Sequence, residues 1–406
     1  MSGWSSTVAL SQTMIVRHFL HWSRTASVAE RAEATSALGH AYLETEFTPG
    51  ERAAAEGALI ALLDDPSPSV RAALAQAMAR SELTPPTIVH TLAADLPEVA
   101  GWMLEHSPLL VDADLVEAVA AGPSDCQLAV AGRAKLSAAV AAAVAEVGSA
   151  EACLTLIENP GATVAMFSID RIVARYGHLV AIRESLLARS DLSVSTHQAL
   201  VAKLSETLAN FAVARDGVGR DQAMRVAKDA CERATIVLAA ASPRKEIKAL
   251  VRHLRESGQL TAGLLLRALL CGNVDLLEHS LAELSDVPLA RVSALVHDRR
   301  GSGFRALYDK AGLPALAYRA FREALETLQE GGFAGSAVEA ACLKRRMVER
   351  VLTRCADEPC EEVEPLLTLL RRFAMEAARE EARLYCETLV EDGTLPARHV
   401  PVRVAA

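Results

Sequence analysis

Apolar residues recur every three or four positions through most of the chain, which is the period of a helix with one buried face. Three such stripes are Val70, Leu74, Ala77 and Met78; Leu200, Leu204, Leu208 and Phe211; and Ile247, Leu250, Val251 and Leu254. No segment shows the strict alternation of a half-buried strand. The pattern therefore predicts an all-α protein whose stripes are packed inward.

Serine or threonine followed by proline recurs where these helices should begin. In Thr48-Pro49-Gly50-Glu51 the hydroxyl can cap the helix, proline suits the first helical position, and the carboxylate follows three residues after the cap. The same hydroxyl-proline pair occurs at Ser67, Thr84, Ser107 and Ser242. This spacing predicts many short helices, each started by a side-chain cap.

The first half of the chain repeats itself. Val70 to Leu74 aligns with Val99 to Met103 and then with Leu128 to Gly132, in steps of 29 residues. A second helix follows each of these, marked by the apolar pairs Ile88 and Leu92, Leu115 and Val119, and Val140 and Val144. Two short amphipathic helices cannot bury their apolar faces alone, so successive pairs must stack into a solenoid with a continuous core.

The residues from Asp65 to Ala75 read DPSPSVRAALA. This segment resembles the turn and helix start of HEAT and leucine-rich-variant repeats, and the resemblance implies that Asp65 and Arg71 tie neighbouring repeats together while Val70 keeps the apolar phase. The next copy has Ala100 where the arginine would stand, so the resemblance implies an irregular ladder.

Most of the chain, including Leu264 to Leu269 and Gly303 to Pro314, resembles an uncharacterised alphaproteobacterial family of helical proteins, itself a domain of unknown function. The resemblance implies a helical architecture and a bacterial cytoplasmic setting, and it carries no catalytic residue. A glycine-containing break near Ala214 to Asp221 indicates a boundary. We expect a HEAT-like repeat region over 14–213, a C-terminal helical domain over 221–390 and a flexible tail over 391–406.

Composition narrows the class further. Of the 406 residues, 51% are hydrophobic but only 4% aromatic, so the core must be filled mainly by alanine, leucine and valine. The longest apolar stretches, Ala138 to Ala145 and Thr261 to Leu270, are far shorter than the roughly 20 residues of a membrane span, and no secretory signal is visible. We therefore expect a cytoplasmic protein without membrane insertion. Cysteines without close pairs predict reduced thiols, and we expect no metal and no cofactor.

The charge balance argues against nucleic acids and other polyanions as partners. Fifty-one acidic residues exceed 42 basic ones, so the net charge of −9 repels polyanions. A basic stretch from Arg215 to Arg255 remains, with ten arginines and lysines. Because aromatic residues are not interleaved with these cations, we interpret them as a solvated helix face and do not expect nucleic-acid binding.

Arg299-Arg300-Gly301-Ser302 is the candidate ligand-binding segment. Two guanidinium groups precede a serine that could cap a helix beginning at Phe304, and free amides at a helix start attract anions. No Gly-x-Ser-x-Gly elbow and no phosphate-binding loop occurs, so no catalytic residue is assigned.

Two functional hypotheses follow. The leading one is a noncatalytic protein-interaction scaffold or regulator that binds an unidentified protein partner through its helical-repeat surface. The alternative is a sensor of an anion or nucleotide-type ligand, or an enzyme acting on such a ligand, that uses Arg299, Arg300 and Ser302.

Overall fold

The protein was analysed as a computed structural model. It describes residues 21–22, 25–215, 219–298, 302–331, 337–356 and 364–391. Throughout these ranges the ordered elements are helices, and the one β-type contact is an isolated bridge between Leu136 and Ala162. The all-α prediction is therefore confirmed. The chain divides into two compact units, Met1–Leu192 and Ser193–Ala406.

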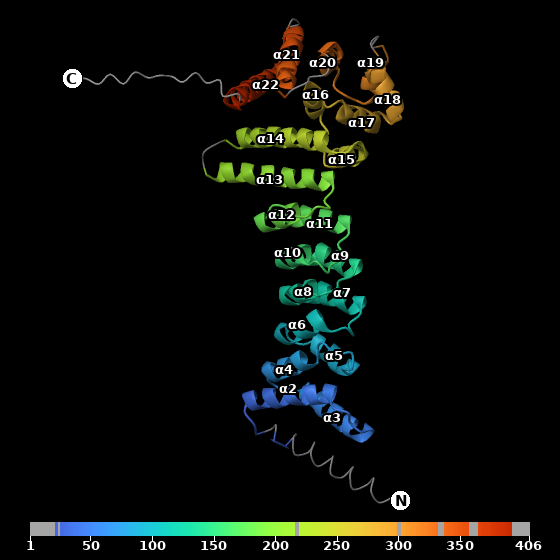
Figure 1. Ribbon diagram of the computed structural model, residues 1–406, viewed down its shortest axis with the longest axis vertical. Helices are drawn as coiled ribbons and strands as arrows, with labels where there is room; N and C mark the ends of the chain where they lie inside the picture. Colours follow the sequence, from blue (N-terminus) through green and yellow to red (C-terminus); the bar gives the residue numbers. More distant parts are fainter. Residues whose placement is uncertain are drawn as a thin grey trace, which may run out of the picture. The chain divides into compact units, whose positions relative to one another are not determined.

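Unit 1 consists of helix pairs whose members form two rows (Figure 1). The first row is α2 (Val28–Glu44), α4 (Pro68–Met78), α6 (Pro97–His106), α8 (Ser124–Ala131), α10 (Ala150–Glu158) and α12 (Val180–Leu187). The second row is α3 (Pro49–Leu62), α5 (Pro86–Ala93), α7 (Asp112–Ala121), α9 (Ala138–Val147) and α11 (Met166–Tyr176). Each helix of the first row packs against the next one in that row, so the core continues from pair to pair.

The stripes expected to face this core do so. Val70, Leu74 and Met78 are fully buried, and so are the second-row residues Ile88 and Leu92. The repeat step of 29 residues, however, is wrong at its second use. Leu128 is 40% exposed, whereas Cys126 and Val130 are the buried residues of α8. Helix α6 starts at Pro97 and α8 at Ser124, a step of 124 − 97 = 27 residues, so the buried positions come two residues earlier than a step of 29 predicts.

Side-chain caps are fewer than the hydroxyl-proline pairs predict. Thr48 forms the expected capping box with Glu51 at the start of α3. The hydroxyl of Thr84 instead donates to the carbonyl of Met78, and α5 starts after Pro85. Ser107 and Ser242 follow the last residues of α6 and α14 and occupy their C-cap positions. Thr84, Ser107 and Ser242 therefore hydrogen-bond to carbonyl groups of the helix before the proline. They do not cap the helix after it.

Unit 2 begins with two long helices, continues with shorter ones and ends with the long helices α21 and α22 (Figure 1). Its helices are α13 (Val194–Ala214), α14 (Arg220–Ala241), α15 (Arg244–Glu256), α16 (Ala262–Leu270), α17 (Val274–Ser285), α18 (Leu289–Val296), α19 (Ser302–Lys310), η1 (Ala315–Ala317), α20 (Tyr318–Gly331), α21 (Ala337–Ala356) and α22 (Glu364–Glu391). Helix α13, placed by sequence in the repeat region, packs extensively on α14 and so belongs to unit 2. The break near Ala214 is the connection within this helix pair.

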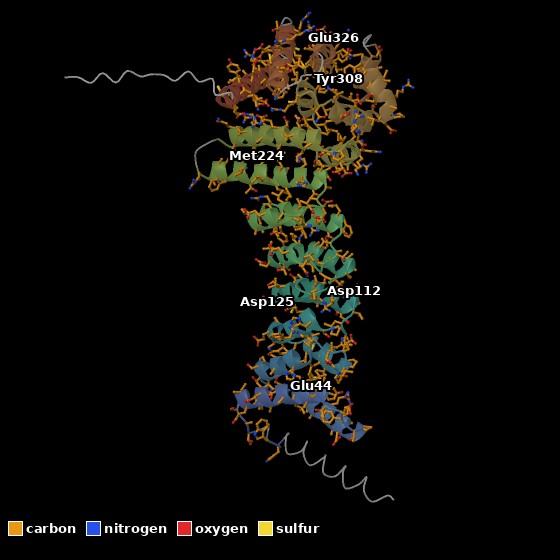
Figure 2. The ribbon with its side chains drawn as sticks, in the orientation of Figure 1. Glu44, Asp112, Asp125, Met224, Tyr308 and Glu326 are labelled. Carbon is orange, nitrogen blue, oxygen red and sulfur yellow. The ribbon has the colours of Figure 1, made fainter. Side chains whose placement is uncertain are left out.

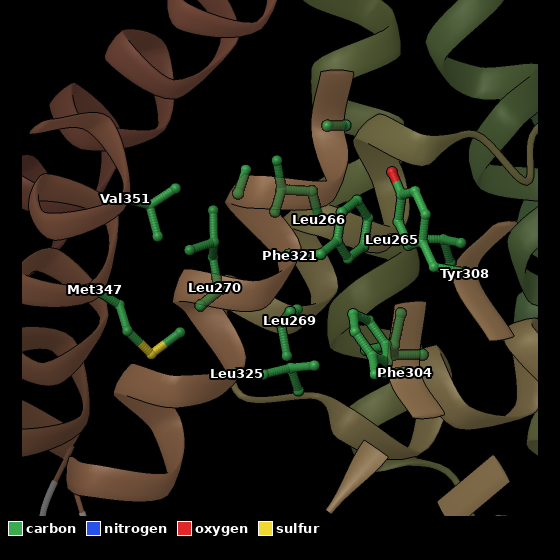
Figure 3. Packing of buried hydrophobic residues seen from close by; sticks show 14 of the residues in the cluster. Leu265, Leu266, Leu269, Leu270, Phe304, Tyr308, Phe321, Leu325, Met347 and Val351 are labelled. Carbon is green, nitrogen blue, oxygen red and sulfur yellow. The ribbon is translucent and has the colours of Figure 1, made fainter. Parts of the chain in front are cut away.

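Helix α16 is the centre of unit 2. All of its residues from Leu264 to Leu270 are buried. On one side it packs against Phe304 and Tyr308 of α19, together with Phe321 of α20 (Figure 3). The Tyr308 hydroxyl is satisfied by donating to the carbonyl of Pro314 at 2.8 Å. A second cluster joins α16 to the apolar stripe of α15, which is buried as predicted.

One predicted stripe is only partly covered. On α13, Leu200 is buried, but Leu204, Leu208 and Phe211 are 38%, 56% and 57% exposed. Helix α14 packs on a different side of α13, where Ala209 is buried. Helical periodicity therefore located an amphipathic helix correctly and its covered face only in part.

Candidate interaction surfaces

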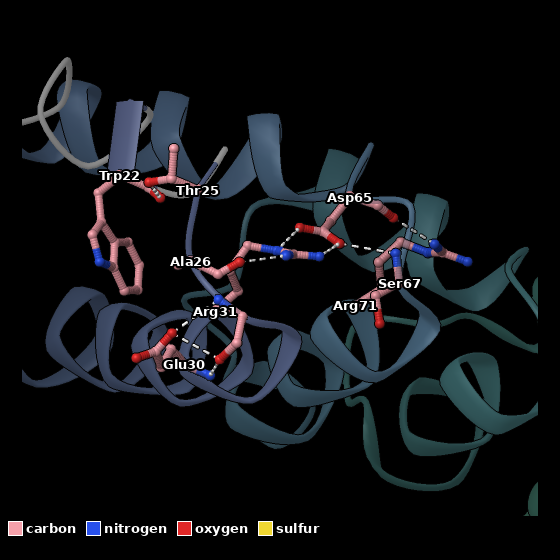
Figure 4. A network of polar contacts seen from close by, with 9 residues as sticks. Trp22, Thr25, Ala26, Glu30, Arg31, Asp65, Ser67 and Arg71 are labelled. Atoms are coloured by element: carbon pink, nitrogen blue, oxygen red, sulfur yellow. Dashed lines mark hydrogen bonds and ion pairs between the residues drawn. The ribbon is translucent and has the colours of Figure 1, made fainter.

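Two arginine-aspartate pairs join consecutive helix pairs at the start of unit 1, and Figure 4 shows the first of them, between Arg31 and Asp65. Arg31 of α2 donates from Nε and Nη2 to the two carboxylate oxygens of Asp65, at 2.8 and 3.0 Å. Arg71 of α4 repeats this with Asp95, at 2.5 and 2.9 Å, and its Nη1 also donates to the carbonyl oxygen of Asp65 at 2.6 Å. Such two-point contacts fix both distance and orientation between neighbouring helix pairs.

The pairing keeps both carboxyl groups ionised. The hydrogen bond from Arg71 lowers the pKa of Asp95 and outweighs the opposing effect of burial. For Asp65, burial raises the pKa, but the hydrogen bonds from Arg31 and the Ser67 amide together lower it below its usual value. These aspartates are therefore charged at neutral pH and act as structural anchors.

Beyond α6 the described arginines of unit 1 do not pair with an aspartate of the next repeat, and Arg133 and Arg175 bind backbone carbonyl groups instead. Arg133, after α8, donates to the carbonyls of Leu104 and Ser107 at the end of α6. Arg175, at the end of α11, donates to the carbonyls of Ala145 and Gly148 at the end of α9. The last carbonyls of a helix are unpaired and carry partial negative charge, so an arginine there satisfies them and favours the helix dipole. Arginine side chains thus link the successive helix pairs from α2 to α11, and the carbonyl contacts of Arg133 and Arg175 have no counterpart in the repeat signature.

This inward use of arginine leaves unit 1 with an acidic exterior. Residues 1–192 contain 12 lysines and arginines against 22 aspartates and glutamates, whereas residues 193–406 contain 30 against 29. The whole net negative charge therefore belongs to unit 1. Glu44, Asp112 and Asp125 are among the acids that project outward (Figure 2).

Three exposed acids occupy matching positions on consecutive first-row helices. Glu98, Asp125 and Glu151 lie in the first turns of α6, α8 and α10. We call these three residues the acidic row. Because packed helices lie about 8–10 Å apart, their carboxylates recur at roughly that interval. Their placement in the first turns also favours the helix dipole, which stabilises these helices.

Unit 2 contains a buried arginine at the meeting point of three helices. The side chain of Arg267, on α16, is 4% exposed and lies 2.7 Å from Glu376 of α22, 3.5 Å from Glu232 and 3.6 Å from Asp229 of α14. Its guanidinium also stacks on the ring of Phe373, 4.1 Å from the ring centre. The Nε and Nη2 groups of Arg267 have no hydrogen-bond partner. Burial raises the pKa of Glu232 despite the nearby Arg267 charge.

Further ion pairs flank this arginine along α22. Arg233 of α14 also binds Glu376, at 2.8 Å. On α21, Lys344 contacts Glu380 at 2.5 Å and Arg345 contacts Glu381 at 3.0 Å. In all of these pairs the cation belongs to the body of unit 2 and the carboxylate to α22.

A cavity of about 220 Å³ lies beside the same cluster, between α13 and α14. Met224, Ala227 and Leu264 supply apolar walls, and Cys231 and Gln259 supply polar groups. The Gln198 amide is buried there and donates to the side-chain oxygen of Gln259 at 2.6 Å. Since these polar groups bond to one another, the cavity carries no functional assignment.

The predicted ligand segment is not assembled into a site within the described residues. Arg299 and Arg300 lie outside them. Ser302 is the first residue of α19, two positions before the expected start at Phe304, and its side chain is not described. The predicted repeat residues are better placed, because Val70 is fully buried and Asp65 and Arg71 make the contacts given above.

The basic stretch from Arg215 to Arg255 is divided among separate contacts. Arg244 pairs with Asp275, and Arg255 binds Glu283 at 3.2 Å, both on α17. Arg233 faces α22, and Arg215 stacks on Phe211. Arg267 was missed as a candidate, although a single arginine inside the apolar run from Leu264 to Leu270 is a detectable signal.

Two negative findings apply to the described part of the chain. It contains no helix that combines the length and apolar character needed to cross a membrane. It also contains no group of three or more histidine, cysteine, aspartate or glutamate residues that could hold a metal ion.

Comparison with known proteins gives one match. The model of a family described as an uncharacterised protein conserved in bacteria, DUF2336, matches residues 99–361. This span begins within α6, includes α7 to α21 and ends before α22 begins at Glu364. No curated protein and no solved structure matches the chain.

Proposed function

The chain belongs to the bacterial family DUF2336, and from this premise we propose that it is a noncatalytic interaction scaffold whose unit 1 binds a basic segment of a partner protein. The separation of charge in unit 1 carries the proposal. Several of its arginines, Arg71 and Arg133 among them, are turned inward to bind aspartates and carbonyls, while acids such as Glu98 stay exposed. A surface of this kind attracts cationic partners and repels nucleic acids.

The spacing of the acidic row suits a helical partner. Seven residues of a helix extend about 10.5 Å, close to the roughly 10 Å between neighbouring first-row helices. A helix with lysine or arginine at every seventh position can therefore place one cation against each carboxylate of the row. The proposed partner is a basic amphipathic helix lying across α6, α8 and α10.

The proposal also covers the class of the repeats and the cellular location of the protein. We infer HEAT-like repeats because Asp65 binds Arg31 of the preceding helix pair and Arg71 binds Asp95 before the following one, as the resemblance implies. A cytoplasmic location in an alphaproteobacterium follows from that resemblance and suits reduced cysteines. The described part of the chain contains seven free cysteines.

Carbodiimide crosslinking tests the binding surface directly. This reagent joins a carboxylate to a lysine amine with loss of water, so it reports only contacts between acids and cations. The full chain is incubated with lysate of its own bacterium, and crosslinked peptides are identified by mass spectrometry. The proposal predicts links from Glu98, Asp125 or Glu151 to lysines of one recurring protein, in a complex that weakens as salt increases.

A matched pair of variants makes the test specific. The triple variant Glu98→Gln, Asp125→Asn, Glu151→Gln should lose the partner. The control triple variant Glu82→Gln, Glu117→Gln, Glu184→Gln removes the same charge from other exposed positions of unit 1 and should retain it. Equal loss in both triples would show that only net charge matters, and equal retention would refute a role for the acidic row.

The ligand alternative is tested separately. A metabolite that binds Arg299 and Arg300 should stabilise the chain by about 2.7 kcal/mol when present at 100 times its Kd. A thermal-shift screen with phosphate-containing metabolites would detect this, and the variant Arg299→Ala/Arg300→Ala should remove the shift. A screen without any shift would reject the ligand alternative and leave the scaffold as the one proposed function.

A further inference from the structure

Helix α22 packs on unit 2 through one narrow face. Its buried residues are Leu367, Leu370, Phe373 and Ala377, at the three- and four-residue spacing of a single helical stripe. From residue 378 to residue 388 none is buried. The buried apolar contact therefore comes from about the first half of the helix, as an amphipathic helix makes when it binds a groove.

Charge complements this apolar stripe. The receiving face supplies Arg233 and Arg267, together with Lys344 and Arg345, while α22 supplies Glu376, Glu380 and Glu381. In one further pair the charges are exchanged, because the cation Arg372 belongs to α22 and the carboxylate Asp229 belongs to α14. The groove thus selects a helix with both an apolar stripe and carboxylates along its edge.

The fit around Arg267 is incomplete. Two of its buried N–H groups have no hydrogen-bond partner, although Glu232 and Asp229 lie within 3.6 Å. Both groups face Glu232 and Asp229 of α14, whereas the Nη1 group that faces α22 is bonded to Glu376 at 2.7 Å. Helix α22 lies beyond the residues 99–361 that the family model matches, whereas Arg267 lies within them.

The geometry points to a helix-binding groove on α14, α16 and α21 that α22 occupies in cis. Its partner in trans is an acidic amphipathic helix of another protein, which displaces α22. That helix carries apolar residues at the spacing of Leu367, Leu370 and Phe373 and carboxylates at the positions of Glu376 and Glu380. The groove is in unit 2 and is independent of the acidic row, so either can fail alone.

Peptide binding to the full chain tests the groove. The probe is a fluorescein-labelled peptide of residues 364–391, and fluorescence polarisation reports its binding. In the full-chain variant Glu376→Lys/Glu380→Lys the resident helix is repelled, so the peptide should bind at least tenfold more tightly than to the wild type. Adding Arg267→Met to that variant, or placing the two lysines in the peptide, should abolish binding.

A control variant changes the same charge elsewhere on α22. Glu364 and Glu387 are exposed and contact only arginines of their own helix, Arg371 and Arg383. The variant Glu364→Lys/Glu387→Lys should therefore bind the peptide no better than the wild type. Tight binding by this control would show that the effect is nonspecific and would overturn the proposal.

Hydrogen exchange on the wild type gives a test that needs no variant. If α22 is a displaceable ligand, its amides in the range 364–377 should exchange through an opening that leaves α16 protected. Excess unlabelled peptide should then accelerate exchange in the resident helix, distinguished by isotope labelling of the chain. Exchange of α22 at the same rate as α16, with no effect of peptide, would show that α22 is an integral part of the core.

Discussion

Arg71 binds both carboxylate oxygens of Asp95, which lies in the loop that precedes the following first-row helix. Only 14% and 15% of the two side chains are exposed, so solvent screens the pair weakly. The same guanidinium reaches back to the carbonyl of Asp65. One side chain therefore sets the position of α4 relative to the loops on both of its sides.

Removing Arg71 should destabilise unit 1. The variant Arg71→Ala leaves Asp95 partly buried without its cation, and we expect a loss of about 2–3 kcal/mol. Arg71→Lys should restore little, because an ammonium group cannot make the two-point contact. Urea denaturation measures the effect. The exposed Arg80→Ala is the control and should change stability by less than about 0.5 kcal/mol; a similar loss in both would disprove the anchoring role.

Acid should weaken the same pair. Because the pKa of Asp95 is lowered in the folded state, its contribution is fully present above the ordinary value of 3.8 and is lost as pH falls through the folded value. The difference in unfolding free energy between wild type and Asp95→Asn should therefore shrink below pH 4. Denaturation at intervals from pH 6 to pH 2.5 measures it, and a constant difference would contradict the assignment.

The buried Cys153 predicts a loss of stability in alkali. Burial raises the pKa of its thiol to about 11 from 9.0, and the nearby Arg175 opposes this only in part. The unfolded chain loses this proton first, so stability present below pH 9 declines as pH rises toward 11. At 1.36 kcal/mol per pH unit the loss is about 2–3 kcal/mol. Relative to Cys153→Ala, the wild type should lose this amount between pH 8 and pH 11; parallel pH profiles would refute the prediction.

A glycine lies next to the isolated β-bridge that joins the segment after α8 to the segment after α10. A Cβ atom at Gly161 would lie 2.0 Å from the carbonyl oxygen of Ala134, beside the bridge from Leu136 to Ala162. Gly161→Ala should therefore destabilise the protein by about 1–3 kcal/mol through backbone displacement. Gly57→Ala in α3, where no atom lies within 4 Å of the new methyl group, should instead stabilise it by about 0.5–1 kcal/mol. Thermal denaturation of both variants decides whether the two effects have opposite signs.

Local pattern predicted the helices well because each needs one apolar face. It located the buried stripe of Val70 and Leu74 and the pairs such as Ile88 and Leu92. It placed Leu128 inside because a fixed repeat step ignores changes in loop length. It placed Leu204 and Leu208 inside because periodicity defines a face but not the helix that covers it.

The candidate surfaces were much less predictable. Arg267 and Glu376 are 109 positions apart in sequence, and only tertiary packing brings them together. Arg133 and Arg175 bind carbonyl groups, which have no side-chain signature in a sequence. Asp65 and Arg71 could be named because the resemblance to a known repeat class supplied their roles, but their pairing with Arg31 and Asp95 required the structure.

The paired aspartates also make the array modular. Asp65 and Asp95 stand at equivalent points before α4 and α6, and each accepts a guanidinium from the helix pair before it. Excision of residues 66–95 would remove one helix pair yet leave Arg31 with an aspartate immediately ahead of the next first-row helix. Genetic gain or loss of a whole module at this point preserves the junction, so such arrays can change in length during evolution without new contacts having to arise.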